Sequence, residues 1–424
     1  MQDTLRTPEN QPARQENANA LVAYFKSGIK NPEEAGRLGV ELEHQVVNTD
    51  MSPVHYSEEF GVEWLLEQLA EDYPQKTYDQ DGDLIGVARK GAAVTLEPAG
   101  QVELSAGPYE GVGEVRLDFE MFERQVSSIW SPKGKRMLSV GYNPTATAPE
   151  LDLAAKTRYQ MMDAHFAGLG DWGRRMMRAT ASTQISIDYF SVEDCLRKLR
   201  LAFACVPLFA LITDNTAVFE GKPRPHKMMR TEVWQKCDPA RCGIVPGVMS
   251  PHFTLEDYAA YILDTPAILV PDGTGWRATE ETFGQAYATT PMEKADVEHA
   301  LSMFFTDVRL KNYIEIRPAD SMPTPHVTAY AALIKGLFYN QESLDALDEL
   351  FSGVTENDIV AAKESLMANG FDGEAYGRPA GELAQKLLDL AHDALEFNEQ
   401  NYLSPLQAVV KQRKTLADLA DRRR

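Results

Sequence analysis

The stretch Gly91-Ala-Ala-Val-Thr-Leu-Glu-Pro-Ala-Gly-Gln-Val-Glu-Leu-Ser105 has the pattern of two short β-strands joined at Pro98-Ala99-Gly100. Side chains along a strand point alternately to opposite faces. One face here is apolar (Val94, Leu96, Val102, Leu104), and the other is polar (Thr95, Glu97, Gln101, Glu103, Ser105). The Pro-Gly break is typical of a bulge or a tight bend. Because the polar face carries acids and no base, the pattern indicates a cation site.

The first predicted strand of the chain, residues 38–47, repeats this arrangement. Glu41, Glu43 and Gln45 lie on one face, and apolar residues alternate with them on the other. The alternative interpretation is an edge strand whose acidic face is solvated. His44 falls on the apolar face, so we expect a core histidine with satisfied hydrogen bonds and not a metal ligand.

Two later segments carry comparable faces. In the strand predicted over residues 180–190, Gln184, Ser186 and Asp188 alternate with apolar residues. Residues 307–318 are predicted as one further strand, in which acid and base lie two residues apart on a shared face (Arg309, Lys311, Tyr313, Glu315, Arg317). This alternation of charge is expected where a metal site meets a phosphate site.

Composition limits the possible function classes. The chain has 424 residues, 44% of them hydrophobic, and a formal net charge of −21. It is long enough for one large domain or two ordinary ones. Its acidic surface repels nucleic acids and anionic membranes, so we expect neither as a partner. The longest apolar run, residues 201–212, is shorter than the ~20 residues of a membrane-spanning helix. With no signal sequence visible, a cytoplasmic protein is expected.

The cysteines and glycines exclude several familiar sites. Four cysteines in a chain of this length fit a reducing compartment. The C-x4-C spacing of Cys237 and Cys242 has no second pair, so free or redox-sensitive thiols are favoured over structural zinc. The sequence contains no P-loop, and the glycines of residues 168–173 do not follow a strand, which excludes a dinucleotide-binding motif there. If the protein uses ATP, it holds the nucleotide in another way.

Residues 215–246 contain a run of basic side chains in an otherwise acidic protein (Lys222, Arg224, His226, Lys227, Arg230, Arg241). Two interpretations compete: an ordinary charged loop, or an anion-binding wall that faces the acidic strands. Arginine is the better candidate for holding a carboxylate or phosphate, because its planar fork donates two hydrogen bonds at once.

The chain divides into three parts by pattern. Residues 1–17 are polar and are predicted to be disordered. Residues 18–340 hold the strands described above and form the predicted catalytic domain. Residues 341–424 read as amphipathic helices that extend this domain and pack on it. The glycine-rich residues 168–173, or residues 221–230, are candidates for a loop that closes over a ligand.

Four separate strands thus place six acids on faces predicted to look inward (Glu41, Glu43, Glu97, Glu103, Asp188, Glu315). Such a cluster stays ionised in a partly desolvated site only if cations neutralise it. All of these ligands offer oxygen, which favours Mg²⁺ first and Mn²⁺ second over zinc. Metal on one wall and arginine on the other is the arrangement that phosphoryl transfer needs.

Several motifs also occur in a fixed order between about residues 35 and 340. They are Val40-Glu-Leu-Glu43, residues 95–105, Met176-Met177, Thr183-Gln-Ile-Ser-Ile-Asp188, Glu220-Gly-Lys-Pro223, Met229-Arg-Thr-Glu-Val-Trp234 and Arg309-Leu-Lys-Asn-Tyr-Ile-Glu-Ile-Arg317. Together they resemble glutamate–cysteine ligases of the plant and proteobacterial branch. Ala99 and Cys242 stand where that branch tends to have Gly and Thr. These differences leave the detail of the local loops undetermined, but they do not change the class that the motifs indicate.

The resemblance implies an α+β fold of the glutamine synthetase type, with about six antiparallel strands curved into a funnel and flanked by helices. It implies Mg²⁺, with Mn²⁺ possible, between ATP and the funnel floor, held by Glu41, Glu43, Glu97, Glu103, Gln184 and Glu315. By motif position, Arg230 would bind the glutamate carboxylate or the phosphoryl group, and Arg317 the transferring phosphate. Glu315 joins them as a catalytic residue, and Trp234, Gln184 and Lys311 complete the substrate- and ATP-binding set.

The implied reaction uses ATP to join the γ-carboxylate of glutamate to the amine of cysteine through a γ-glutamyl phosphate. Its products are γ-glutamylcysteine, ADP and phosphate, the first step of glutathione-type thiol synthesis, and a monomer or homodimer is expected. Three alternatives stay open: a ligase of the same superfamily with another amine acceptor, a non-catalytic metal- or nucleotide-binding relative, and an oxygen-ligated hydrolase. The hydrolase is disfavoured because no general base stands apart from the acids.

Overall fold

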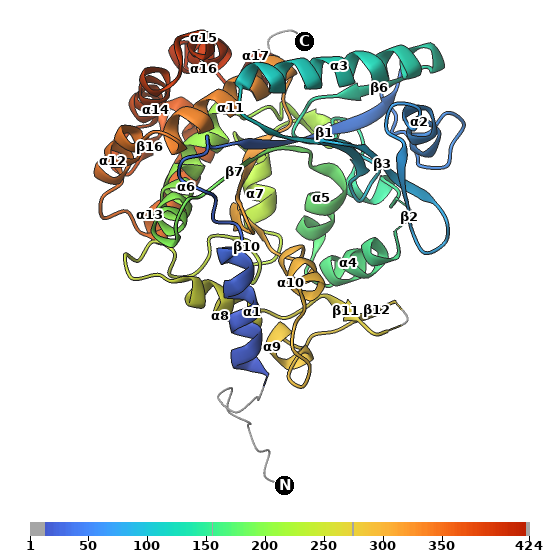
Figure 1. Ribbon diagram of the computed structural model, residues 1–424. Coiled ribbons are helices and arrows are strands. Elements are labelled where there is room, and N and C mark those ends of the chain that lie inside the picture. Colours follow the sequence, from blue (N-terminus) through green and yellow to red (C-terminus); the bar gives the residue numbers. More distant parts are fainter. Residues whose placement is uncertain (1–12, 155, 274, 421–424) are drawn as a thin grey trace.

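The computed structural model describes residues 13–154, 156–273 and 275–420, and one antiparallel sheet of nine strands lies at its centre (Figure 1). Eight strands follow one another across the sheet: β14 (Val308–Leu310), β15 (Ile314–Asp320), β7 (Ser182–Ile187), β1 (Leu38–Asn48), β5 (Val102–Tyr109), β4 (Ala92–Leu96), β3 (Leu84–Arg89) and β2 (Gln75–Tyr78). The ninth, β6 (Lys135–Leu138), pairs with the end of β1. The predicted α+β class and antiparallel sheet are confirmed, with nine strands instead of about six.

The strand register brings the predicted acids side by side. Glu43 of β1 lies directly opposite Glu103 of β5, and Glu41 lies opposite Gln184 of β7. Residues opposite each other in antiparallel strands have Cβ atoms about 4.5–5.5 Å apart on the same face. The predicted turn between β4 and β5 closes through a hydrogen bond from the Gly100 amide to the Glu97 carbonyl, and Gly100 takes a φ of +78° that favours glycine. The turn holds Glu97 at the edge of the same face.

The opposite face of the sheet is apolar and covered by helices. Leu42, Val94 and Leu104 are at most 1% exposed. Helix α3 (Val112–Trp130) packs there with the buried stripe expected of an amphipathic helix (Val115, Phe119, Phe122, Val126, Trp130). Helix α11 (Thr324–Phe338) lies beside it (Figure 1). His44 is buried on this side as expected, but among the residues that the structure describes only its Nδ1 atom has a hydrogen-bond partner, so the prediction of a histidine with satisfied hydrogen bonds was wrong.

Helices α4 (Thr157–Gly168), α5 (Asp171–Ala179) and α7 (Met229–Gln235) lie on the other side of the sheet (Figure 1). The expected flexible loop over residues 168–173 is instead the junction of α4 and α5. A Cβ atom on Gly173 would lie 2.6 Å from the Cβ of Phe166, so this glycine permits close helix packing. Composition cannot distinguish a glycine kept for close packing from one kept for mobility.

The single strand expected over residues 307–318 is a hairpin. Strands β14 and β15 pair through Arg309 opposite Glu315, and the Lys311 amide donates to the Tyr313 carbonyl in the turn. The turn residues Lys311, Asn312 and Tyr313 include no glycine or proline, the usual sequence marks of such a turn. The charged side chains still share one face, because the register pairs residues of the same parity.

The remaining elements surround this frame. The buried helix α6 (Val192–Ile212) begins at a cap, where the Ser191 hydroxyl accepts a hydrogen bond from the Asp194 amide. The other helices of the first 340 residues are α1 (Arg14–Lys26), α2 (Val62–Leu69), α8 (Leu255–Asp264), α9 (Phe283–Ala286) and α10 (Lys294–Leu301). Short strands pair as β8 (Val218–Phe219) with β9 (Lys222–Pro223), β10 (Cys242–Gly243) with β13 (Phe305–Thr306), and β11 (Leu269–Pro271) with β12 (Trp276–Ala278).

The N-terminal prediction is corrected in part. Helix α1 begins at Arg14, inside the segment expected to be disordered; residues 1–12 of that segment lie outside the described residues. Asn17 is fully buried, donates to the Tyr287 carbonyl at 2.9 Å and accepts from the Met292 amide at 2.7 Å. These partners are about 270 residues away in the chain, so a local polar composition does not reveal them.

After residue 340 the chain is mainly helical: α12 (Gln341–Leu350), α13 (Glu356–Asn369), α14 (Ala380–Ala394), α15 (Phe397–Gln400), α16 (Ser404–Gln412) and α17 (Leu416–Ala420), with one small hairpin of β16 (Glu374–Ala375) and β17 (Arg378–Pro379). Helices α14 and α16 pack on α11 and α6. All four cysteines are buried free thiols. Across residues 13–154, 156–273 and 275–420, every helix is too short or too polar to cross a membrane.

Candidate active site

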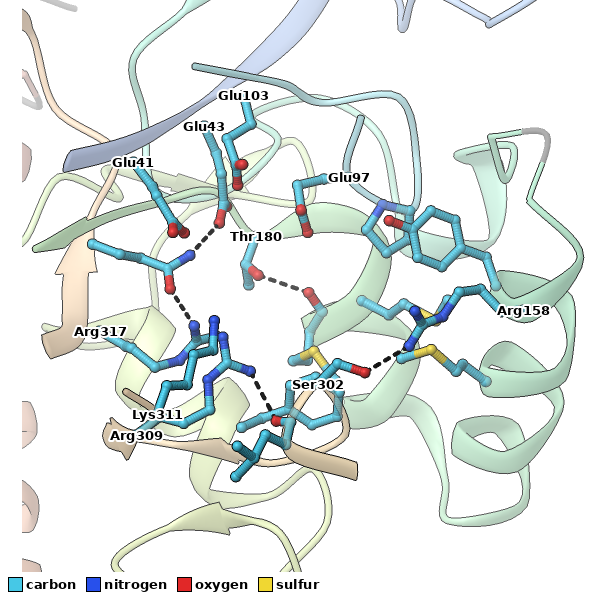
Figure 2. Close-up of a pocket in the computed structure, with 18 of the residues that line it drawn as sticks. Glu41, Glu43, Glu97, Glu103, Arg158, Thr180, Ser302, Arg309, Lys311 and Arg317 are labelled. Atoms are coloured by element: carbon cyan, nitrogen blue, oxygen red, sulfur yellow. Dashed lines mark hydrogen bonds between the residues drawn. The ribbon is translucent and has the colours of Figure 1, made fainter. Parts of the chain in front are cut away.

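A cavity of about 680 Å³ lies on the polar side of the sheet. Figure 2 shows Glu41, Glu43, Glu97 and Glu103 along one wall and Arg309, Lys311 and Arg317 along another. Of the residues predicted from the sequence, eight line this cavity: Glu41, Glu43, Glu97, Glu103, Gln184, Trp234, Lys311 and Arg317. Acids and bases far apart in the sequence therefore face one shared space.

Three of the carboxylates converge tightly. Glu43, Glu97 and Glu103 each offer one oxygen, and these oxygens lie within 4.8 Å of one another. Glu43 is oriented by the Ser182 amide at 2.7 Å, the Ser182 hydroxyl at 2.6 Å and the Gln184 amide group at 3.0 Å. This is an all-oxygen donor set, the kind that hard divalent cations prefer.

Without a bound cation, burial and mutual repulsion disfavour the charged forms of these carboxylates. Burial, together with the charges of Glu103 and Glu315, raises the pKa of Glu41 to about 8. Burial and the neighbouring Glu43 and Glu103 carboxylates raise the pKa of Glu97 well above its ordinary value. Burial likewise raises the pKa of Glu43, against the opposing charge of Arg230. A bound cation favours the ionised forms and reverses these shifts, so the cluster fits a divalent metal.

Glu315 has a different environment from the other acids. It is fully buried, and its two oxygens accept from Arg309 and Arg317 at 2.7 Å and from Lys311 at 3.0 Å. Burial alone would raise the pKa of Glu315, but these three cations outweigh it and hold the pKa far below the ordinary value. Glu315 thus anchors the cationic wall, and its roles as metal ligand and catalytic residue stay predictions.

Arg317 links the two walls. Besides its ion pair with Glu315, it donates a hydrogen bond to the side-chain oxygen of Gln184. Gln184 in turn donates to Glu43. The cationic wall and the acid cluster are therefore held in fixed relation by one chain of polar contacts.

Arg230 and Trp234 come from one face of the short helix α7. The guanidinium carbon of Arg230 lies 4.7 Å from the centre of the Trp234 ring, and its Nη2 is 3.4 Å from the Arg317 carbonyl. Arg230 is 5% exposed, and its Nη1 has no hydrogen-bond partner among the described residues. Arg230 does not itself line the cavity, but it contacts Trp234 and Arg317, which do, and a buried arginine with an unused donor is suited to bind an anionic ligand.

The other members of the basic run do not reach the cavity. Arg224 and Lys227 pair with Asp418, and Arg224 also with Asp214; His226 lies 2.7 Å from Glu232, and Arg241 donates to Asp238 at 2.6 Å. The interpretation as an anion-binding wall is therefore wrong for these residues, and for Arg230 it stays a prediction. The acids that they meet are on segments that the sequence did not place nearby.

Asp188 does not belong to the acid cluster of the first cavity, but it still lies on the polar side of the sheet. It follows the end of β7, and its Oδ2 accepts a hydrogen bond from the Arg37 amide at 3.0 Å. Asp188 lines a second cavity of about 560 Å³.

This second cavity adjoins the first: Glu41, Asn312 and Tyr313 line both. Its other lining residues include three cationic side chains and main chain at glycines and alanines (Lys30, Arg37, Arg89, Gly91, Ala92, Ala106, Gly107). The two cavities together extend across the polar face on both sides of Glu41.

Sequence reasoning missed one group of site residues at the start of α4. Lys156 donates to the Leu96 carbonyl at 2.7 Å, and Arg158 donates to Ser302 at 2.9 Å; both line the first cavity with Tyr159. Burial lowers the pKa of Lys156. The run Lys156-Thr-Arg-Tyr159, basic and aromatic in an acidic protein, was the available signal.

An antiparallel sheet with clustered carboxylates opposite a wall of arginine and lysine fits the class of ligases with a glutamine synthetase-like fold. The particular family follows from the sequence. The chain belongs to glutamate–cysteine ligase family 2, whose family model matches residues 37–423.

Individual relatives agree with this membership. The chain is 29% identical over 411 residues to chloroplastic glutamate–cysteine ligase B of Oryza sativa subsp. japonica, which covers 94% of this chain and 82% of the rice protein. It is also 29% identical to the chloroplastic glutamate–cysteine ligase of Arabidopsis thaliana, over 92% of this chain and 76% of that protein. The crystal structure of glutamate–cysteine ligase from Francisella tularensis in complex with AMP has the same fold, with a TM-score of 0.55, 10% sequence identity, and coverage of 90% of this chain and 83% of that one.

Proposed function

We propose that this protein joins the γ-carboxylate of glutamate to the amine of cysteine with the use of ATP, through a γ-glutamyl phosphate. Besides the family membership, one observation carries the proposal. Oxygens of Glu43, Glu97 and Glu103 lie within 4.8 Å of one another on a cavity that Lys311 and Arg317 also line. Bringing a carboxylate to a nucleotide phosphate requires neutralisation of both negative charges, and this arrangement can provide it.

The acid cluster fits Mg²⁺ by its donor set, and the residues that would hold it are Glu43, Glu97 and Glu103, with Glu41 and Gln184 beside them. Bound there, Mg²⁺ or Mn²⁺ would supply positive charge for the phosphate oxygens of ATP and for the glutamate carboxylate. Glu315 would orient Arg309, Lys311 and Arg317 through its ion pairs with them.

The two adjoining cavities suggest where each substrate lies. The nucleotide would occupy the second cavity, with its phosphates directed past Glu41 toward Arg317 and Lys311. Glutamate would lie in the first cavity beside Trp234, which lines it, and its α-carboxylate would be directed toward Arg230, which lies against the Trp234 ring and has an unused donor. The reacting γ-carboxylate would then lie between the two walls.

After transfer of the phosphoryl group, the amine of the acceptor attacks the acyl phosphate and phosphate leaves. Arg317 and Lys311 stabilise the charge that moves to the departing phosphate. No side-chain nucleophile is needed, and no Ser–His or Cys–His pair occurs among the residues that line the described cavity.

Phosphate release measured with ATP, Mg²⁺ and glutamate, plus one candidate amine at a time, tests the proposal. We expect release to depend on glutamate, on metal and on cysteine, with γ-glutamylcysteine detected by mass spectrometry. Release with another amino acid and not with cysteine would assign a different acceptor within the same chemistry. If no amine gives phosphate release and ATP binding does not depend on Mg²⁺, the protein is a non-catalytic relative.

We further propose a cytoplasmic location and a monomeric or homodimeric state, on the grounds of composition and the expected fold class. The rice and Arabidopsis relatives named above are chloroplastic proteins. Fractionation of the source cells and light scattering of the purified protein would test these two points.

A further inference from the structure

The face of the sheet opposite the active site contains a separate polar cavity of about 290 Å³. Its lining includes His44 of β1, Glu123 of α3, Arg136 of β6 and Thr324 at the start of α11. None of its lining residues also lines the active-site cavity. Its contents would contact the strand that carries Glu41 and Glu43 without touching the reacting groups.

One atom of His44 lacks a partner at this cavity. The Nδ1 atom lies 3.2 Å from the Val102 carbonyl oxygen, and since a carbonyl only accepts, Nδ1 carries the proton. The other ring nitrogen, Nε2, is buried and has no hydrogen-bond partner among the described residues. Glu123 Oε1 is 3.5 Å from it, longer than the ~2.7–2.9 Å of a charge-assisted hydrogen bond. His44 Nε2 and the Glu123 carboxylate thus face each other without a hydrogen bond between them, and a donor placed between the two can serve both.

Thr324 provides a second unused group. Thr324 is 1% exposed, and its hydroxyl has no partner among the described residues. It is the first residue of α11, a helix of 15 residues whose N-terminal end carries partial positive charge. Arg136 adds a full positive charge to the same cavity. Thr324 and Arg136 are therefore suited to an anionic group, while His44 and Glu123 are suited to a donor.

We propose that this cavity binds a small zwitterion with the chemistry of an α-amino acid. The ammonium group would lie between His44 and Glu123, and the carboxylate at Thr324 and Arg136. An ammonium group has three N–H donors, so it can serve His44 Nε2 and Glu123 at once. The carboxylate accepts from the Thr324 hydroxyl and from a guanidinium. The volume lies just below the ~300–1,000 Å³ of sites for drug-sized ligands, which favours a ligand of amino-acid size.

Isothermal titration calorimetry of the intact protein with glycine, L-alanine, L-serine and L-methionine tests the proposal, with ethylamine and propionate as probes for each half. We expect at least one amino acid to bind at least tenfold more tightly than either half-probe. Glu123→Gln and the isosteric Thr324→Val should each weaken that binding by roughly ten- to a hundredfold, because each leaves one charged ligand group without its partner. Binding of an amino acid in the active site would not respond to these variants.

Glu120→Gln is the matched control, because Glu120 lies on the same helix, pairs with Arg116 and does not line the cavity. It should leave the titration unchanged. The proposal is overturned if none of the four amino acids binds, or if their binding is the same in wild type, Glu123→Gln and Thr324→Val. Equal losses in Glu120→Gln and Glu123→Gln would also overturn it, since the effect would then belong to the helix surface and not to the cavity.

Discussion

Replacing Glu41 by glutamine should stabilise the metal-free protein, and by an amount that depends on pH. Burial and the charges of Glu103 and Glu315 raise the pKa of Glu41 from 4.5 to about 8 in the folded protein. The unfolded chain therefore binds fewer protons than the folded chain between these two pH values. Under this condition the free energy of unfolding falls as the pH rises, and a neutral side chain of the same shape removes that loss.

The magnitude follows from the shift. Each pH unit between about 4.5 and 8 costs the wild type roughly 1.4 kcal/mol. At pH 7 the loss reaches at most about 3 kcal/mol, and less in practice because Glu41 keeps partial contact with the open cavity. We expect Glu41→Gln to be more stable than wild type by between about 1 and 3 kcal/mol at pH 7, and by less than about 1 kcal/mol at pH 5.

Denaturant unfolding in EDTA at pH 5, 6, 7 and 8 measures this difference. Saturating Mg²⁺ should reduce the stability difference between Glu41→Gln and wild type at pH 7, because the bound cation stabilises the charged Glu41 of the wild type, and the variant has no such charge. Glu364→Gln, at an exposed position on α13, is the control and should show no pH-dependent gap. The reasoning is refuted if Glu41→Gln is less stable than wild type at pH 7, or if the gap at pH 5 equals that at pH 7.

Glu103→Gln should abolish turnover and the stabilisation by Mg²⁺. Its free energy of unfolding without metal should stay within about 1 kcal/mol of the wild-type value, since the new amide oxygen can still accept from Thr95. Thermal unfolding with and without Mg²⁺ distinguishes loss of metal binding from loss of the fold. Arg230→Lys keeps the charge and loses the two-pronged donor, so steady-state kinetics should show the KM for glutamate rising roughly tenfold, and an unchanged KM would remove Arg230 from that role. Lys363→Met breaks the buried ion pair with Asp307 at 2.5 Å and should cost about 3 kcal/mol in urea unfolding. Adding Asp307→Asn should recover part of that loss in stability. If it recovers none, the loss comes from the packing of the Lys363 side chain and not from the unpaired charge.

The features that local sequence predicted well are those decided by neighbouring residues. The β4–β5 pair follows from alternation and from the Pro98–Gly100 break. The cap at Ser191 follows from the acid three residues later. In each case the deciding contacts lie within a few residues, so the pattern contains the answer.

The features that local sequence did not predict depend on partners far along the chain. Arg224 and Lys227 looked like part of an anion site, but Asp418, about 190 residues later, pairs with both. The hairpin between β14 and β15 turns at residues without glycine or proline, so only its pairing with β7 shows where each strand ends. Charge and spacing do not identify which opposite charge a side chain will meet.

The sequence by itself determined the chemistry of each strand face, because side-chain direction along a strand alternates with a period of two whatever the rest of the chain does. It therefore determined that Glu41, Glu43 and Glu103 would share faces with amides and not with the core. The tertiary structure alone decided that Glu97 joins Glu43 and Glu103 while Glu315 is taken up by arginine and lysine, and that His44 borders a cavity. The physical reason is that these distances depend on strand register and helix packing between segments up to 280 residues apart, and not on any local preference.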